Sequence, residues 1–285
     1  MDLIELFLAP LRYPFMWRGL IASLMVGTLC AVVGTYVVLR GMAFLGDALA
    51  HAILPGVAAA YLLGQPLFWG ALLMGLLTAV GIGFVSRRAE IKEDTAIGIL
   101  FAASFALGIA LLSTVQSYSV DLTHILFGNI LGVSDQDLVL TGALGLFVLL
   151  VIILLYKELL VVTFDPVFAT TVGLPTTALH YTLLVLIALT IVVSIQTVGV
   201  ALMVAMLVTP ATTAYLLTRK MWQMMLVGAG CGVFSAVAGL YISFYTNVAS
   251  GSAVVLVSTA LFLLAMLFAP RRGMVWGWAG RRHAG

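Results

Sequence analysis

The sequence predicts an all-α polytopic membrane protein with about nine transmembrane helices, with eight as the alternative count. Of its 285 residues, 63% are apolar and only 8% are charged, whereas about a quarter of the residues in soluble domains are charged. The mean hydropathy is +1.21, and apolar stretches recur at about the 20-residue length that crosses a hydrocarbon core. The net charge of +2 is too small, and its basic residues too scattered, for a nucleic-acid-binding face, so that class is excluded.

Nine candidate spans follow one another along the chain, separated by Gly, Pro and polar residues. No small-residue cleavage site follows the first span, so we expect permanent membrane embedding rather than a removable signal peptide. We expect an N-terminal interfacial segment over residues 1–16, a single transmembrane domain over 17–270 and a basic tail over 271–285. The spans are Trp17–Leu39, Ala43–Leu63, Leu67–Ser86, Thr95–Ser113, Asp137–Tyr156, Thr177–Ile195, Val198–Thr218, Trp222–Tyr245 and Ser252–Ala269.

The basic residues predict the orientation of the spans, because Lys and Arg in short loops favour the cytoplasmic side. If nine spans cross the membrane in alternating directions, the loops that contain most of the Lys and Arg residues lie on one face. The acidic loop Ser113–Gln136 lies on the other face. We therefore expect a cytoplasmic C-terminus and an external N-terminus, which leaves Arg12 and Arg18 outside, against the charge rule. The cytoplasmic face then carries Arg87, Arg88, Lys92, Lys157, Arg219, Lys220, Arg271, Arg272, Arg281 and Arg282.

The longest cytoplasmic gap, Lys157 to Thr176, contains the start and stop signals of a short helix over residues 163–175. Asp165 or Thr163 can cap free N–H groups, and Pro166 suits the first helical position. Gly173 can adopt the left-handed closing conformation. These signals predict a helix of about two turns that lies on the membrane face and contacts another protein.

Asp47 and His51 are an acidic residue and a histidine that this segmentation places together inside one span. Their i, i+4 spacing puts both side chains on one helical face. A carboxylate beside an imidazole forms half of a site for zinc, iron or manganese, and other groups must complete the shell. Two other interpretations stay open, namely a helix cap at the inner interface with a hydrogen-bonded histidine and a proton relay.

Two proline-containing breaks could line a polar path or simply pack, and these are Pro55 in the second span and Thr209-Pro210 in the seventh. We expect His124, His180 and His283 to be surface or interfacial residues, while Cys30 and Cys231 suit an apolar core. The sequence has no phosphate-binding loop, HExxH motif or catalytic triad, and we expect no enzymatic activity. If ATP energises transport, another chain must bind it.

Four segments taken together resemble the membrane permease subunits of ATP-binding-cassette importers for zinc, manganese or iron. More distantly they resemble the cobalamin and iron-siderophore permeases, and thus the type II importer fold. The Asp/His pair is the specific part, because the siderophore and cobalamin relatives lack it. The segments are Arg18–Ala22, Phe44–Gly56, Phe164–Pro175 and Val198–Ala211.

The resemblance implies that Asp47 and His51 from each of two subunits coordinate Zn²⁺ or Mn²⁺, or else Fe²⁺, in the translocation path. It implies that Arg18 docks an extracytoplasmic solute-binding protein. It also implies that residues 163–175 form a coupling helix that docks on a cytoplasmic ATPase dimer, where ATP binds. The coupling residues would be Asp165, Pro166, Phe168, Ala169, Gly173 and Leu174.

A second permease copy is expected on physical grounds, because two ligands per chain become four at a two-fold axis. The sequence leaves open whether that partner is an identical chain or a paralogue, and it does not choose among the three metals. The expected location is a bacterial cytoplasmic membrane. The alternative function is a secondary metal transporter or channel driven by an ion gradient. Protonation of His51 would compete with metal, so uptake should weaken in acid.

Overall fold

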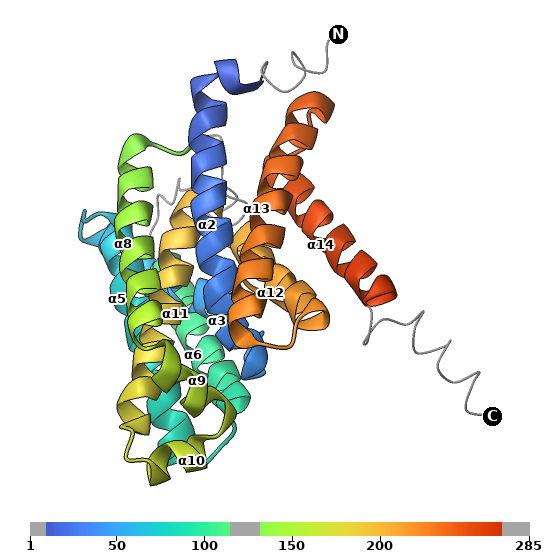
Figure 1. The fold of residues 1–285 in the computed structure, drawn as a ribbon. Coiled ribbons are helices and arrows are strands. Elements are labelled where there is room, and N and C mark those ends of the chain that lie inside the picture. The colour runs from blue at the N-terminus through green and yellow to red at the C-terminus, as the bar shows by residue number, and fades with distance from the viewer. Residues whose placement is uncertain (1–9, 115–131, 270–285) are drawn as a thin grey trace, which may run out of the picture.

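A computed structural model describes residues 10–114 and 132–269, and within these ranges the chain forms helices and no strand (Figure 1). Residues 1–9, His124 and the tail from residue 270, with His283, lie outside the described residues. The elements are η1 (Pro10–Arg12), α2 (Pro14–Leu39), α3 (Leu45–Ala52), α4 (Leu54–Leu62), α5 (Leu67–Arg88), α6 (Glu93–Ser113), α8 (Asp135–Leu154), α9 (Tyr156–Phe164), α10 (Pro166–Thr171), α11 (Thr176–Val198), α12 (Val200–Leu217), α13 (Met221–Thr246) and α14 (Ser250–Phe268).

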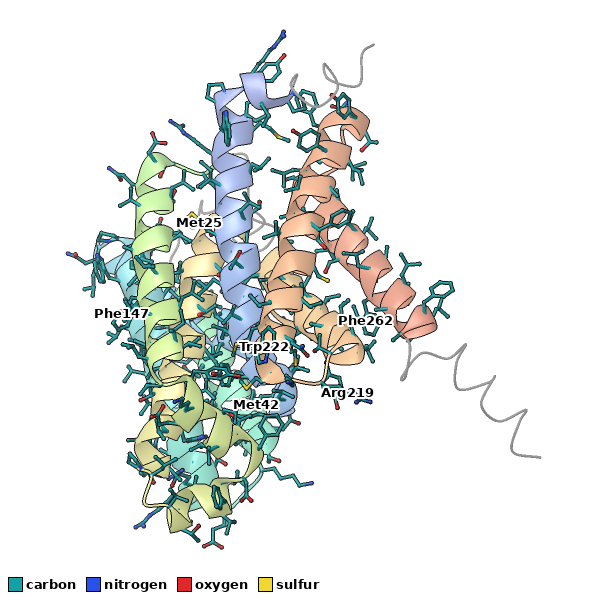
Figure 2. All side chains as sticks on the ribbon, in the orientation of Figure 1. Met25, Met42, Phe147, Arg219, Trp222 and Phe262 are labelled. Atoms are coloured by element: carbon teal, nitrogen blue, oxygen red, sulfur yellow. The ribbon has the colours of Figure 1, made fainter. Side chains whose placement is uncertain are left out.

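Nine helical stretches in the described part of the chain are long and apolar enough to cross a membrane, with α3 and α4 together counted as one. The predicted all-α membrane architecture with nine spans is confirmed. In Figure 1 the starts of α2 and α8 lie at the upper end, and α10 lies at the lower end. We call the lower end the basic end, because it carries the α5–α6 turn with Arg87 and Lys92. Figure 2 places Arg219 at the α12–α13 turn.

The centre of the bundle is built by α2 and α11, which are the most buried spans. α2 packs on α13, α12 and α8, while α11 packs on α5 and α8. α3, α4, α5 and α6 contact one another and attach to this centre through α11. By contrast, α6, α8 and α14 are largely exposed along their apolar lengths, as expected for surfaces that face lipid or another subunit.

Glycines allow two pairs of helices to touch through their backbones. A Cβ atom at Gly56 of α4 would collide with the carbonyl of Gly70 in α5, and a Cβ at Gly70 would collide with the Gly56 carbonyl. Gly34 of α2 lies equally close to the Leu207 carbonyl of α12. Such contacts are a typical way for membrane helices to associate, because lipid supplies no hydrophobic driving force between them.

Two sequence expectations about helix breaks differ in outcome. The break at Pro55 is present, because α3 ends at Ala52 and α4 begins at Leu54. The expected break at Thr209-Pro210 is wrong, because α12 continues through Pro210 to Leu217. The Thr213 hydroxyl donates to the Thr209 carbonyl at 2.8 Å, and neighbouring helices and hydroxyls are what make proline tolerable inside membrane helices.

The segment after Lys157, expected to be a loop, is instead the helix α9. Lys157 and Glu158 interrupt the run of apolar residues, and for this reason the sequence predicted a loop between two spans here. Leu159 and Val162 nevertheless form a buried stripe at i, i+3 spacing. The fifth span therefore ends at Leu154, and α9 carries the chain onward to α10.

Candidate functional site

The candidate metal ligands Asp47 and His51 lie on successive turns of α3, as predicted. The His51 Nδ1 atom is 3.0 Å from the Asp47 backbone carbonyl and 3.7 Å from its carboxylate Oδ1. Because a carbonyl oxygen only accepts, Nδ1 carries the proton and donates it. In the neutral imidazole the other ring nitrogen, Nε2, then holds the lone pair that can bind a metal ion.

Both side chains are open on the surface of the single chain. The Asp47 side chain is 43% exposed and that of His51 is 27% exposed. No group of three or more His, Cys, Asp or Glu side chains that could hold a metal ion occurs in the described ranges. As candidate metal ligands, Asp47 and His51 would form a half-site, and an ion bound there would need further ligands, such as water or groups of another subunit.

The His51 ring packs against aromatic side chains of α6, which the sequence analysis did not single out. Phe101 and Phe105 contact it edge to face, with ring centroids 6.0 and 5.8 Å away and interplanar angles of 86° and 76°. Phe44, just before α3, contacts Phe101 at 5.9 Å. The half-site thus lies beside a cluster of three phenylalanine rings.

The candidate pathway residues lie on two elements near the half-site. Pro55 is buried in the first turn of α4. Pro210 is buried inside α12, and Thr209 beside it is half-buried. α12 also contacts α3, where a Cβ at Gly46 would meet the Leu207 side chain.

Arg18 lies at the upper end of α2 and pairs with Asp135, the first residue of α8. Its guanidinium NH2 group donates to the Asp135 carboxylate at 2.7 Å, and the two side chains are 44% and 73% exposed. Asp137 closes a capping box with Ser134 and accepts from Gln196 of α11 at 2.8 Å. The upper ends of α2, α8 and α11 are therefore joined by exposed polar contacts.

The short helix predicted near the basic end is present as α10. The Asp165 carboxylate caps it by accepting from the Phe168 N–H at 2.8 Å, and Pro166 occupies its first turn. Gly173 has φ +83°, and the Leu174 N–H donates to the Ala169 carbonyl, which closes the helix. Ala169 is buried and anchors the helix to the bundle.

The outer surface of α10 and its flanks is apolar and exposed. Its large side chains are Phe164, Val167, Phe168 and Val172, which are 54% to 72% exposed. Exposed apolar clusters of this kind mark interaction surfaces.

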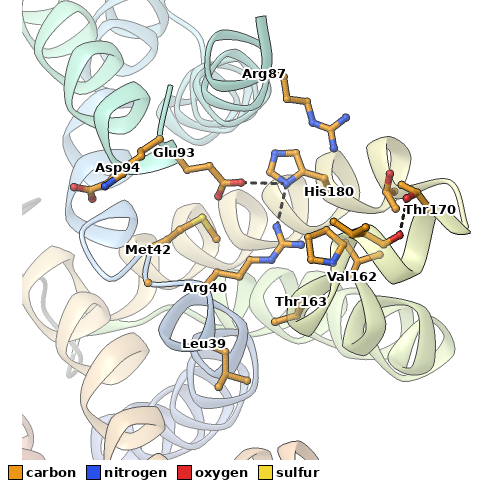
Figure 3. A pocket seen from close by; sticks show the side chains of 15 residues that line it. Leu39, Arg40, Met42, Arg87, Glu93, Asp94, Val162, Thr163, Thr170 and His180 are labelled. Atoms are coloured by element: carbon orange, nitrogen blue, oxygen red, sulfur yellow. Dashed lines mark hydrogen bonds and ion pairs between the residues drawn. The ribbon is translucent and has the colours of Figure 1, made fainter. Parts of the chain in front are cut away.

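A partly buried polar cluster near the basic end joins three helices, and Figure 3 shows its side chains converging. The Arg40 guanidinium, just after α2, donates to His180 Nδ1 at 3.0 Å. The Glu93 carboxylate, at the start of α6, lies 3.6 Å from the same nitrogen. Burial lowers the pKa of Arg40, and the nearby Glu93 raises it.

His180 was expected at the surface or interface, and the structure corrects this expectation. It lies on the second turn of α11 and is only 5% exposed. Since a guanidinium only donates, Nδ1 accepts and the proton sits on Nε2, which has no hydrogen-bond partner in the described part of the chain. The cluster borders a cavity of about 730 Å³ between the end of α2, the α5–α6 turn, α10 and α11.

Comparisons with known proteins add to this geometry. A family model described as the ABC 3 transport family matches residues 12–269. The manganese transport system membrane protein MntC of Halalkalibacterium halodurans is 50% identical over 95% of this chain and 94% of its own length. The chelated iron transport system membrane protein YfeD of Yersinia pestis is 41% identical over 93% of this chain and 89% of its own length.

A solved structure agrees with the fold. It is that of PsaBC from Streptococcus pneumoniae in complex with Fab, and it superposes with a TM-score of 0.82 at 42% identity. The match covers 94% of this chain and 97% of the solved chain.

Proposed function

The chain belongs to the ABC 3 transport family, and from that premise we propose that its cargo is Mn²⁺, bound on the way through the membrane by Asp47 and His51. It is the membrane permease subunit of a metal importer of the ATP-binding-cassette class. Manganese is favoured because MntC, the relative with 50% identity, is named for it. Fe²⁺ is the second candidate, because YfeD is named for chelated iron. Carboxylate oxygen and imidazole nitrogen suit both ions, and Zn²⁺ as well.

The observation that carries the metal site is the geometry of α3. The bond from His51 Nδ1 to the Asp47 carbonyl leaves Nε2 of the neutral imidazole as the nitrogen with a free lone pair, and the carboxylate lies on the same face one turn away. A second permease subunit, either an identical copy or a paralogue, would present its own pair across a two-fold axis. Two half-sites then give four protein ligands.

The second subunit must approach over the exposed side of α3, because that is where both ligands are accessible. Pro55 lies on α4, which follows α3 directly, and Thr209 and Pro210 lie on α12, which contacts α3. All three are proposed to line the path. The break at Pro55 frees backbone groups that can face a polar path.

α10 is proposed as the coupling helix that docks on a separate ATPase chain. Its exposed Phe168, with its apolar neighbours, fits a groove in a partner protein. Asp165, Pro166, Gly173 and Leu174 fix its ends, and Ala169 anchors it. ATP binding and hydrolysis are assigned to that partner, because the sequence holds no phosphate-binding loop.

A short chain of contacts leads from α10 to the metal ligands. α10 is followed by the first turns of α11, which carry His180. His180 accepts from Arg40, which stands at the start of the turn into α3. A displacement of α10 by the ATPase would thereby reach the helix that bears Asp47 and His51.

The proposed location is a bacterial cytoplasmic membrane, with the basic end in the cytoplasm and the N-terminus outside. This places Arg18 at the outer mouth, where a solute-binding protein would deliver the ion. Arg18 and Asp135 carry opposite charges and pair with each other there. Docking of the binding protein would therefore replace part of this ion pair with contacts to the binding protein.

The test is uptake of radioactive Mn²⁺ by cells that lack their own manganese importers and express this chain with its ATPase and binding protein. Asp47→Asn and His51→Ala should each lower uptake at least about tenfold, because even partners of metal ligands cost that much when lost. Glu90→Gln, which changes an exposed acid at the basic end, should leave uptake unchanged.

The quantity of each variant in the membrane and its co-purification with the ATPase must match the wild type. Unchanged uptake by both site variants would refute the metal site. Uptake that persists with a catalytically inactive ATPase would instead favour a secondary transporter. Competition by Fe²⁺ and Zn²⁺ ranks the cargo.

A further inference from the structure

The strongest unassigned feature lies between the half-site and α6. Phe101 and Phe105 are one turn apart on α6, and their rings stack with centroids 5.8 Å apart at 19°. Both rings meet the His51 imidazole nearly perpendicularly, at 86° and 76°. This places His51 in an aromatic corner made by two residues of another span.

The corner and the hydrogen bond constrain different motions of the imidazole. The bond from Nδ1 to the Asp47 carbonyl selects the tautomer, and it leaves the ring free to rock about that bond. The two phenyl rings oppose that rocking, because edge-to-face contacts hold a defined angle and distance. With both in place, Nε2 points in one direction relative to the Asp47 carboxylate.

We propose that Phe101 and Phe105 are positioning residues that hold His51 Nε2 toward the ion and thereby set the preference of the site for transition-metal ions over Mg²⁺ and Ca²⁺. The inference rests on the proposed role of Asp47 and His51 as cargo ligands. An ion ligand must be held within about half an ångström of its productive position to be effective. If the imidazole ring can rock, its Nε2 atom is in position to coordinate the ion for a smaller fraction of the time, and the ion binds less tightly.

Selectivity follows from the chemistry of the two ligands. A carboxylate binds Mg²⁺, Ca²⁺ and Mn²⁺, whereas imidazole nitrogen favours transition metals. Loosening His51 therefore weakens the binding of Mn²⁺ while the carboxylate continues to attract Mg²⁺ and Ca²⁺. The affinity for Mn²⁺ should fall, and so should the ratio of this affinity to the affinities for Mg²⁺ and Ca²⁺.

The experiment measures Mn²⁺ uptake against Mn²⁺ concentration, with and without excess Mg²⁺ or Ca²⁺, for Phe101→Leu, Phe105→Leu and the double variant. The apparent KM for Mn²⁺ should rise about two- to tenfold, which corresponds to about 0.4 to 1.4 kcal/mol. Inhibition by Mg²⁺ or Ca²⁺ should strengthen, while the maximal rate per molecule in the membrane stays near that of the wild type. Phe101→Tyr keeps the ring and should restore the wild-type KM.

Phe147→Leu on α8 is the matched control, because the same change occurs there on a side chain that is 52% exposed. It should leave KM and ion competition unchanged. Should a Leu variant fail to accumulate, Phe105→Met retains more volume without a ring and gives the same comparison.

His51→Ala separates this inference from the proposed function. If His51→Ala abolishes uptake while the phenylalanine variants behave like Phe147→Leu, the positioning role is overturned and the metal site stands. A fall in the maximal rate with KM and competition unchanged would also overturn it, because that result indicates ordinary packing. If His51→Ala itself takes up Mn²⁺ normally, both proposals fail.

Discussion

Breaking the contact between Arg40 and His180 should reveal a coupled pair within the fold. Arg40 donates to His180 across 140 positions of sequence at 3.0 Å, beside a cavity near the basic end. A hydrogen bond that involves a charged group contributes about 1.5 to 3 kcal/mol. His180→Leu leaves a half-buried guanidinium without this acceptor, and Arg40→Met leaves a buried imidazole without its donor. Each single change should therefore lower the free energy of unfolding by about 2 kcal/mol.

The double variant should lose less than the sum of the two single changes, because neither partner is then stranded. We expect a coupling energy of about 1.5 to 3 kcal/mol in a double-mutant cycle. The assay is denaturant unfolding in detergent micelles, followed by the loss of helical signal. The control cycle pairs His180→Leu with Arg88→Met, which removes an exposed cation at the end of α5. Additivity of the Arg40 and His180 effects within about 0.5 kcal/mol would refute the reasoning.

Three further perturbations test other parts of the structure. Asp165→Ala removes the cap of α10, at a cost of about 1 kcal/mol in local helix stability, and should weaken co-purification with the ATPase, whereas Asp165→Asn should retain it. Gly56→Ala places a methyl group against the α5 backbone and should sharply lower the yield of folded protein in detergent; Gly98→Ala, which has open space around it, should not, and equal yields would contradict the close approach. Arg18→Glu should leave stability within about 1 kcal/mol, because its ion pair is exposed, yet reduce retention of the binding protein in pull-down assays; undiminished retention would remove Arg18 from the docking surface.

Hydropathy and local signals predicted much of this fold. Each span can be identified from hydropathy alone, because a helix must be apolar over the full membrane thickness whatever its neighbours are. The ends of α10 were equally readable, since Asp165, Pro166 and Gly173 act on the adjacent backbone alone. The break before Pro55 belongs to the same class of local signal. The i, i+4 spacing of Asp47 and His51 likewise predicts their common helical face without any tertiary contact.

The features that sequence missed depend on contacts between distant segments. His180 was expected at the surface or interface because its partner Arg40, just after α2, is distant in the sequence. Phe101 and Phe105 carry no local signal that distinguishes them from other aromatic residues in an apolar span. Pro210 resembled a helix break, because the local rule against proline is relaxed by neighbouring helices in a membrane.

The backbone contact between Gly56 and Gly70 has a mechanical consequence. Most helix pairs slide or tilt by letting side chains between them change rotamer, but here no rotatable bond separates the two main chains. Sliding or tilting of α4 against α5 is therefore restricted, and the two helices behave as a stiff hairpin. Bending at the break before Pro55 would therefore move α4 and α5 together, and because α5 packs on α11, that movement would be passed on to α11.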